Sequence, residues 1–255
     1  MDRTEFEREA GRLLALSREQ GVTLRLVGAL AFARRCPGHV HLQETLGREY
    51  TDIDFAGYGR EADRILSFLS GAGYVDDPQV FVDSEGSRMI LENPETRLHL
   101  DVFLDKLEFC HTVSWKGRLE IDGETIPLAE MLMQKMQIVR INEKDLIDTI
   151  MLLLEHPLTE DDGGINIDRI AKVCAKDWGW WRTLTMNLDK VQQMAASYPQ
   201  LTDEEQARIA AQVALARARI EAEPKSLGWK LRAKVGDRKK WYREVDDLAP
   251  AMEET

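Results

Sequence analysis

The sequence lacks an apolar run long enough to cross a bilayer, and its first residues do not form a signal-peptide pattern. It has only three cysteines, which lie far apart and form no CxxC pair. Neither a disulfide framework nor a cysteine-based zinc site is therefore expected, and reduced thiols favour a cytoplasmic location. These absences argue against the membrane-spanning and the disulfide-rich secreted classes of protein.

A net positive charge is also lacking, since the formal net charge is −11, which argues against a protein that coats nucleic acid non-specifically. Residues 225–243 depart from this balance, because they contain eight cations, one acid and interleaved aromatic residues. These residues are Lys225, Lys230, Arg232, Lys234, Arg238, Lys239, Lys240 and Arg243, then Asp237, and then Trp229, Trp241 and Tyr242. This basic tail could contact RNA phosphates or the acid-rich surface of the preceding domain, or form a solvated helix that balances the protein's own charge.

Helix and strand patterns are mixed without the strict alternation of a doubly wound sheet. The sequence therefore predicts an α+β fold, with a small mixed β-sheet core flanked by helices. An acidic, glycine-containing loop at residues 159–164 marks a boundary between a domain at 1–158 and an all-helical C-terminal domain at 165–255. Thr202 and Glu205 form a capping-box pattern for a helix in the second domain.

Three strand-like runs are expected at residues 79–82, 87–91 and 97–104, the last two joined by a turn at 93–96. The Asp122-Gly123 pair predicts a hairpin between residues 118–121 and 124–126. A helix is expected at residues 128–140, followed by another that ends at His156 before Pro157.

Two aspartates, Asp52 and Asp54, lie one residue apart in a strand-like apolar segment, so both point to the same face of that strand. Burying two like charges together is costly. A divalent cation between them makes the arrangement favourable, since Mg²⁺ takes carboxylate oxygens as ligands. The alternative is an exposed strand with two solvated acids.

A second chemical feature precedes this pair. A short strand at residues 24–27 runs into Gly28 and then into a helix-forming run from Ala29. Free backbone N–H groups at such a helix start can bind phosphate oxygens, although a glycine here can also serve only a tight turn. Further along, the alternating strand at 97–103 offers a third acid, Asp101.

Lys135 projects from the apolar stripe of the expected helix at 128–140, where an unpaired lysine is rare. Its side chain could extend outward to solvent. The functional interpretation is that it reaches a triphosphate or the acidic residues.

Taken in order, these pieces resemble the nucleotidyltransferase superfamily, which has the DNA polymerase beta-type catalytic fold. The closest likeness is to the bacterial abortive-infection and toxin-type nucleotidyltransferases. The resemblance covers about residues 20–156. The pieces that carry it are Val27-Gly28-Ala29-Leu30-Ala31, Arg48 with Thr51-Asp52-Ile53-Asp54, His99-Leu100-Asp101-Val102-Phe103, and Leu132-Met133-Gln134-Lys135-Met136-Gln137 followed by Arg140, Lys144, Asp145 and Asp148.

The resemblance implies a metal-dependent transferase. Asp52, Asp54 and Asp101 would be the catalytic residues and would hold one or two Mg²⁺ ions. The enzyme would move a nucleoside monophosphate from a nucleoside triphosphate (NTP) to an acceptor hydroxyl and release pyrophosphate. The acceptor stays open between RNA or tRNA, a protein and a small molecule.

The resemblance also implies a nucleotide site. Gly28 and the amide of Ala29 would cradle the phosphates, while Lys135 and Arg48 would neutralise the triphosphate. Ala29 stands where the family usually has a glycine or a serine, which removes a hydroxyl contact but keeps the backbone donors.

Two other hypotheses remain. The chain could be a catalytically inactive nucleotide-binding or interaction module on the same fold. Alternatively, it could fall outside the superfamily, with Asp52 and Asp54 on a solvated strand, in which case Asp101 should lie far from them.

Overall fold

The computed structural model describes residues 3–244, and its centre is a five-stranded sheet in the order β1-β2-β5-β4-β3. The strands are β1 (Arg25–Leu26), β2 (Asp52–Gly57), β3 (Val75–Asp76), β4 (Arg88–Glu92) and β5 (His99–Leu104). Only β2 and β5 are parallel, while the other neighbours are antiparallel. The mixed α+β class with a small mixed sheet is therefore confirmed.

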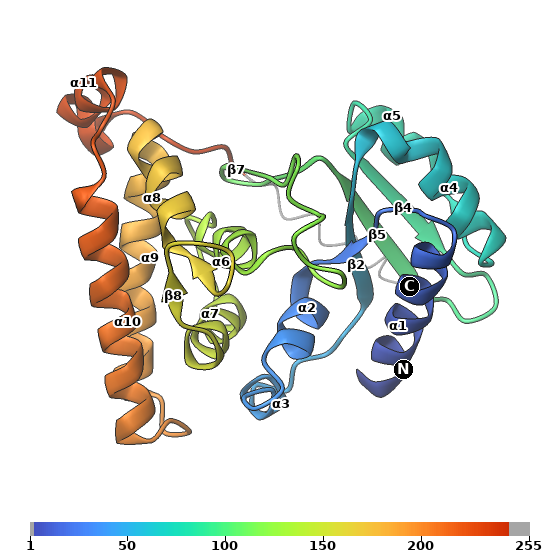
Figure 1. Cartoon of the computed structure of the whole chain (residues 1–255), viewed down its shortest axis with the longest axis horizontal. Coiled ribbons are helices and arrows are strands. Elements are labelled where there is room, and N and C mark those ends of the chain that lie inside the picture. Colours follow the sequence, from blue (N-terminus) through green and yellow to red (C-terminus); the bar gives the residue numbers. More distant parts are fainter. Residues whose placement is uncertain (1–2, 245–255) are drawn as a thin grey trace, which may run out of the picture.

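Helices lie on both sides of this sheet. They are α1 (Arg3–Glu19), α2 (Gly28–Arg35), α3 (His41–Thr45), α4 (Ala62–Gly71) and α5 (Pro78–Asp83). In the view of Figure 1, α1 and α4 lie to the right of the sheet, and α2 and α3 lie to its left. The site described below lies on the α2 side.

The strand expected at residues 79–82 is wrong, because this segment is the helix α5. The side chain of Asp77 accepts a hydrogen bond from the backbone N–H of Gln79, at 3.1 Å. Pro78 occupies the first helical position, where its missing N–H costs nothing. Local capping therefore outweighs the strand propensity of the Val-Phe-Val run.

The hairpin expected around Asp122-Gly123 is also wrong, since no strand pair forms there among residues 3–244. The Asp122 carboxylate instead accepts hydrogen bonds from the backbone N–H groups of Glu124 and Thr125, at 2.8 and 2.9 Å. Thr125 then bridges to Leu26, so this segment continues the sheet beside β1.

After β5 the chain forms a small hairpin and then mainly helices. The elements are β6 (Lys106–Glu108), β7 (Thr112–Ser114), α6 (Leu128–Met136), α7 (Glu143–Glu155), β8 (Leu158–Thr159), β9 (Ile165–Asn166), α8 (Ile167–Lys176), α9 (Trp178–Ser197), α10 (Asp203–Ala222) and α11 (Leu227–Val235). The predicted capping box of Thr202 and Glu205 begins α10. Helices α8, α9 and α10 pack together and against α6 or α7, and one hydrophobic core runs from Phe6 to Ile220.

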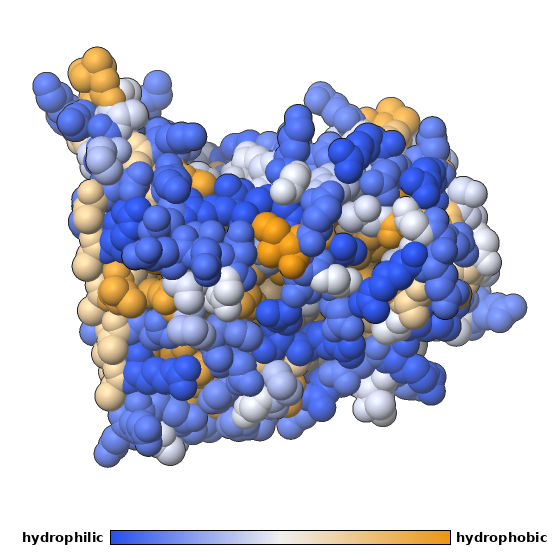
Figure 2. Space-filling view, in the orientation of Figure 1, coloured by the Kyte–Doolittle hydropathy of each residue, from blue (hydrophilic) through white to orange (hydrophobic). Residues whose placement is uncertain are grey.

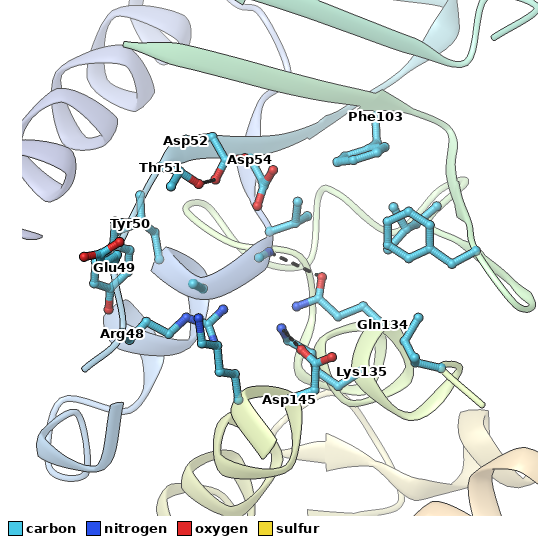
Figure 3. Close-up of a pocket in the computed structure, with 18 residues that line it drawn as sticks. Arg48, Glu49, Tyr50, Thr51, Asp52, Asp54, Phe103, Gln134, Lys135 and Asp145 are labelled. Carbon is cyan, nitrogen blue, oxygen red and sulfur yellow. Dashed lines mark hydrogen bonds and ion pairs between the residues drawn. The ribbon is translucent and has the colours of Figure 1, made fainter. Parts of the chain in front are cut away.

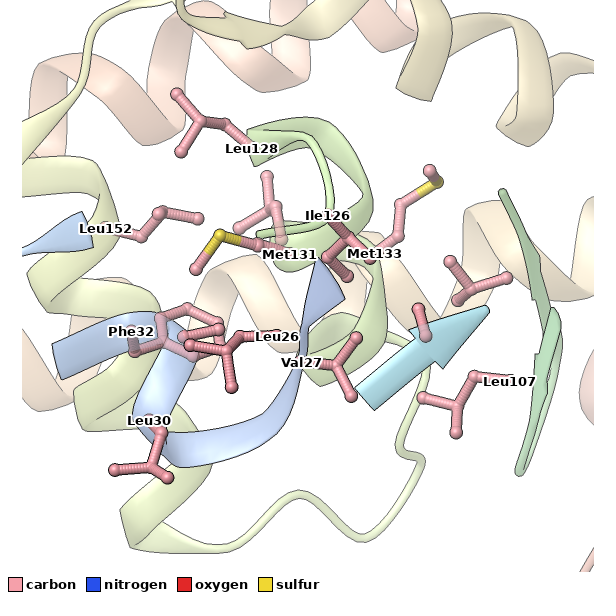
Figure 4. Close-up of a cluster of buried hydrophobic side chains, with 14 of the residues drawn as sticks. Leu26, Val27, Leu30, Phe32, Leu107, Ile126, Leu128, Met131, Met133 and Leu152 are labelled. Carbon is pink, nitrogen blue, oxygen red and sulfur yellow. The ribbon is translucent and has the colours of Figure 1, made fainter. Parts of the chain in front are cut away.

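One part of this core positions the helices around the site. Leu26 of β1 and Phe32 of α2 lie close to Met131 of α6 and Leu152 of α7 (Figure 4). Burying an aliphatic or aromatic side chain contributes about 1.5–3 kcal/mol to stability. This packing holds α2, α6 and α7 together beside β1.

The outer face drawn in Figure 2 is mainly hydrophilic, with small apolar groups. Among the larger apolar side chains that remain exposed, Leu227 and Leu231 lie on α11. In the described part of the chain, no helix is both long and apolar enough to span a membrane.

Candidate active site

The aspartate pair lies on β2, and the pleat of that strand separates it from the core. Ile53 and Phe55 are completely buried, whereas Asp54 is half-buried and Asp52 is exposed. The register pairs Asp54 with Asp101 on the parallel neighbour β5. The hypothesis that Asp101 lies far from the pair is therefore wrong, and the sheet brings all three acids to one region.

Gly28 packs directly against Asp54. A Cβ atom added at residue 28 would lie only 2.0 Å from Asp54 Oδ2. The φ angle of Gly28 is +66°, a conformation that L residues with a side chain rarely adopt. In addition, the N–H of Val27 donates to the carbonyl oxygen of Asp54, at 3.0 Å. Glycine is therefore required here, and it places the first turn of α2 beside the acid.

A cleft of about 420 Å³ opens between these elements, a size within the range of small-molecule sites, which is about 300–1,000 Å³. Asp52 and Asp54 project into it from β2, and Gln134 and Lys135 approach from α6 on the other side (Figure 3). The start of α2 lies between the two groups. Acidic and donor groups thus face each other across one cavity.

Gln134 is a cleft residue that the sequence did not single out as a site residue. Its side chain is only 5% exposed, and its Oε1 accepts a long hydrogen bond of 3.4 Å from the N–H of Gly28. Its Nε2 has no hydrogen-bond partner among the described residues. A buried amide donor without a partner is costly, so this group is suited to a ligand with an acceptor oxygen.

Lys135 lies in the cleft wall, and it is paired rather than free. Its Nζ is 2.6 Å from Asp145 Oδ1 and 2.9 Å from Asp148 Oδ2. Burial alone would lower the pKa of Lys135, but the carboxylates of Asp148 and Asp145 outweigh it, and the pKa is raised. The lysine therefore stays charged and offers a fixed positive charge at this wall.

Arg48 adds a second cation to the same group. Its Nη1 lies 3.3 Å from Asp148 Oδ2. Gln43 donates to the other oxygen of Asp148 at 2.6 Å and accepts from the Tyr50 hydroxyl, also at 2.6 Å. Asp148 is completely buried, so these contacts hold both Arg48 and Lys135 in place. The family resemblance implied that both cations lie at a nucleotide site, and both line the cleft.

Asp101 is engaged differently from the other two acids. Arg88 of β4 donates from Nε to both Asp101 oxygens, at 2.9 and 3.0 Å, and its Nη2 also donates to Oδ2. Burial raises the pKa of Asp101, and the hydrogen bonds and charge of Arg88 counter part of that shift. Within residues 3–244, no group of three or more His, Cys, Asp or Glu side chains is arranged to hold a metal ion.

No ion pair to an arginine or lysine, like that between Arg88 and Asp101, is formed by Asp54 within residues 3–244. Burial first, and then the nearby carboxylates of Asp52 and Asp101, raise the pKa of Asp54 well above its ordinary value. The positive charges of Lys135 and Arg88 lower it, but by less. The surrounding protein therefore disfavours the ionised form of Asp54, because its cations do not offset burial and the neighbouring carboxylates.

Several cations of the basic tail have partners within the protein. Lys225, Arg232 and Arg238 donate to backbone carbonyl oxygens of the tail or of the preceding helix. Arg243 pairs with Glu108 at 3.1 Å, and it also donates to the carbonyl oxygen of Phe109, which lines the cleft. The tail thus contacts an acid of the preceding domain, which was one of the alternatives that the sequence left open.

Comparison with known protein families finds no family model that matches this chain. Comparisons with curated proteins and with solved structures find no significant match either.

Proposed function

We propose that this chain is a divalent-metal-dependent nucleotidyltransferase on a polymerase beta-type core, which transfers a nucleoside monophosphate from an NTP to an acceptor hydroxyl. The observation that carries this proposal is the contact between Gly28 and Asp54. It sets a helix start, which is suited to phosphate oxygens, directly beside the aspartate pair. Neither feature alone would define a site, but the unpartnered Nε2 of Gln134 points to a ligand in the same cleft.

The residues present fit one Mg²⁺ ion. Asp52 and Asp54 supply hard oxygen ligands, and a bound cation would stabilise the ionised form of Asp54, which burial and its acidic neighbours disfavour. Asp101 is less suited to be a third ligand, because Arg88 holds both of its oxygens. When bound, the ion would withdraw charge from the triphosphate.

The protein's own donors would hold the triphosphate. The amides of Gly28 and Ala29 lie in the first turn of α2, where the helix dipole favours anions. Gln134 Nε2 would donate to a phosphate oxygen, and Lys135 and Arg48 would offset the negative charge from the opposite wall.

In the reaction, the acceptor hydroxyl oxygen forms a bond with the α-phosphorus. The bond from that phosphorus to the oxygen bridging the α- and β-phosphates breaks, and pyrophosphate leaves. The hydroxyl proton passes to solvent. Asp101 would act here as a positioning residue beside Asp54, since Arg88 occupies its carboxylate.

RNA is the acceptor class that we favour. Lys230, Lys234 and Lys239 of the basic tail have no ion-pair partner in the part of the chain that is described, and they remain available for phosphates. The tail also reaches the cleft rim through the contact of Arg243 with Phe109.

The transfer itself can be tested with labelled nucleotides. The protein is incubated with total RNA, Mg²⁺ and each of the four NTPs, labelled at either the α- or the γ-phosphate. We expect label from the α-phosphate in the RNA and none from the γ-phosphate, with at least a roughly 100-fold loss in Asp52→Asn/Asp54→Asn. Asp63→Asn, an exposed acid on α4, is the matched control and should transfer normally.

Transfer of the γ-phosphate would instead indicate a kinase and would refute the proposal. Nucleotide binding without transfer to RNA, to protein or to small hydroxylated molecules would support the non-catalytic nucleotide-binding module.

A further inference from the structure

Both oxygens of the third acid are committed to a guanidinium group. Arg88 Nε lies 2.9 Å from Asp101 Oδ1 and 3.0 Å from Oδ2, and Nη2 adds a further hydrogen bond to Oδ2. Such two-pronged pairs between arginine and a carboxylate are among the strongest charge-assisted contacts in proteins. Asp101 is only 7% exposed, so water competes little for it.

Arg88 is also held from a second direction. Its guanidinium lies over the ring of Phe103, with 5.3 Å between the guanidinium carbon and the ring centroid. Phe103 lines the cleft and follows Asp101 by two residues on β5, so it lies on the same face of the sheet. The ring and the carboxylate therefore fix the guanidinium at the edge of the acidic group.

The charge of Arg88 reaches the aspartate pair as well. Its neighbours include Asp54 and Asp52 in addition to Asp101, and all three carboxylates raise the pKa of Arg88. Arginine stays protonated at any physiological pH, so this positive charge is permanent. A divalent cation placed at Asp101 would meet repulsion from it.

We infer that Arg88 takes the place of a second divalent cation in this site. Building on the proposed function, the chain binds a single ion through Asp52 and Asp54, while Arg88 neutralises Asp101. Removing the guanidinium frees the Asp101 carboxylate beside Asp54 and creates a second ion site.

Counting bound ions tests this inference without measuring activity. The probe is Mn²⁺ alone, and the free Mn²⁺ signal in electron paramagnetic resonance gives the number of ions bound per chain. We expect one ion for the wild type and two for Arg88→Gln. Arg97→Gln removes an exposed arginine near the same sheet and should still bind one ion.

The charge-neutral double variant Arg88→Gln/Asp101→Asn shows which residue makes the second site. We expect it to bind one ion, with an affinity within about threefold of the wild type. It also leaves no unpaired charge at this position, so it remains informative if Arg88→Gln alone does not fold.

Two ions bound to the wild type, or one ion bound to a folded Arg88→Gln, would overturn the role of Arg88 and leave the proposed function standing. Loss of the remaining ion in the double variant would also overturn it, because Asp101 would then be a ligand. No ion bound to the wild type would overturn both the inference and the proposed function.

Discussion

Replacing Asp54 with asparagine should abolish nucleotidyl transfer and, at neutral pH, make the ligand-free protein more stable by about 1 kcal/mol. Activity falls because a carboxylate beside the start of α2 is lost. Stability rises because the charge of Asp54 is half-buried and lies near the carboxylates of Asp52 and Asp101, which together raise its pKa. Replacing a residue that serves only the fold would not lower the activity and at the same time raise the free energy of unfolding.

This gain should depend on pH. The folded protein holds the Asp54 proton more tightly than the unfolded chain, because the pKa of Asp54 is raised by burial and then by Asp52 and Asp101. The charged carboxylate therefore costs stability above the folded-state pKa. That cost fades as the pH falls through the raised pKa towards the unfolded value of about 3.9.

Urea unfolding at pH 7 and at lower pH measures this effect. The difference in the free energy of unfolding between Asp54→Asn and the wild type should shrink as the pH falls, while Asp63→Asn should show no such trend. A variant that is less stable than the wild type at pH 7, or a difference that does not change with pH, would show that Asp54 carries no unfavourable charge.

Replacing Gly28 with alanine is expected to be the most damaging single-methyl change in the site. The new Cβ atom would lie 2.0 Å from Asp54 Oδ2, and the φ angle of +66° is itself strained for alanine. We expect a loss of about 3 kcal/mol in stability, from backbone strain together with displacement of the carboxylate. Transfer should fall by about 100-fold, because small shifts of catalytic groups are costly.

Gly117→Ala is the matched control. Its φ angle of +68° is nearly the same, but nothing lies within 4 Å of the added Cβ. It should therefore show only the backbone cost, of about 1–2 kcal/mol, and full activity. Equal losses in the two variants, with transfer intact in Gly28→Ala, would show that the contact with Asp54 has no functional role.

The sequence predicted the acidic face because strand periodicity is local. Asp52 and Asp54 fall on the solvent side of β2, and the buried Ile53 and Phe55 fix the other side. Arg88 could not be found in this way, since its contact depends on the pairing of β4 with β5. That register places Ile90 opposite Asp101, which makes Arg88 a diagonal neighbour of the acid on the same face.

Gln134 escaped prediction for another reason. Every residue of α6 is buried, so its sequence has no polar side that marks which residues face a cleft. Lys135 was noticeable as a charge in an apolar helix, whereas a glutamine beside it carries no such signal. Only the packing of α6 against α2 identifies the amide as a donor in the site.

The most direct test of the central proposal is a calorimetric titration of each of the four NTPs, with and without Mg²⁺, into the wild type and into Asp52→Asn/Asp54→Asn. We expect at least one NTP to bind the wild type only when Mg²⁺ is present, and no Mg²⁺-dependent binding in the double variant. If no NTP binds at millimolar concentration, or if binding is the same without Mg²⁺ and in the double variant, the aspartate pair is not a metal–nucleotide site.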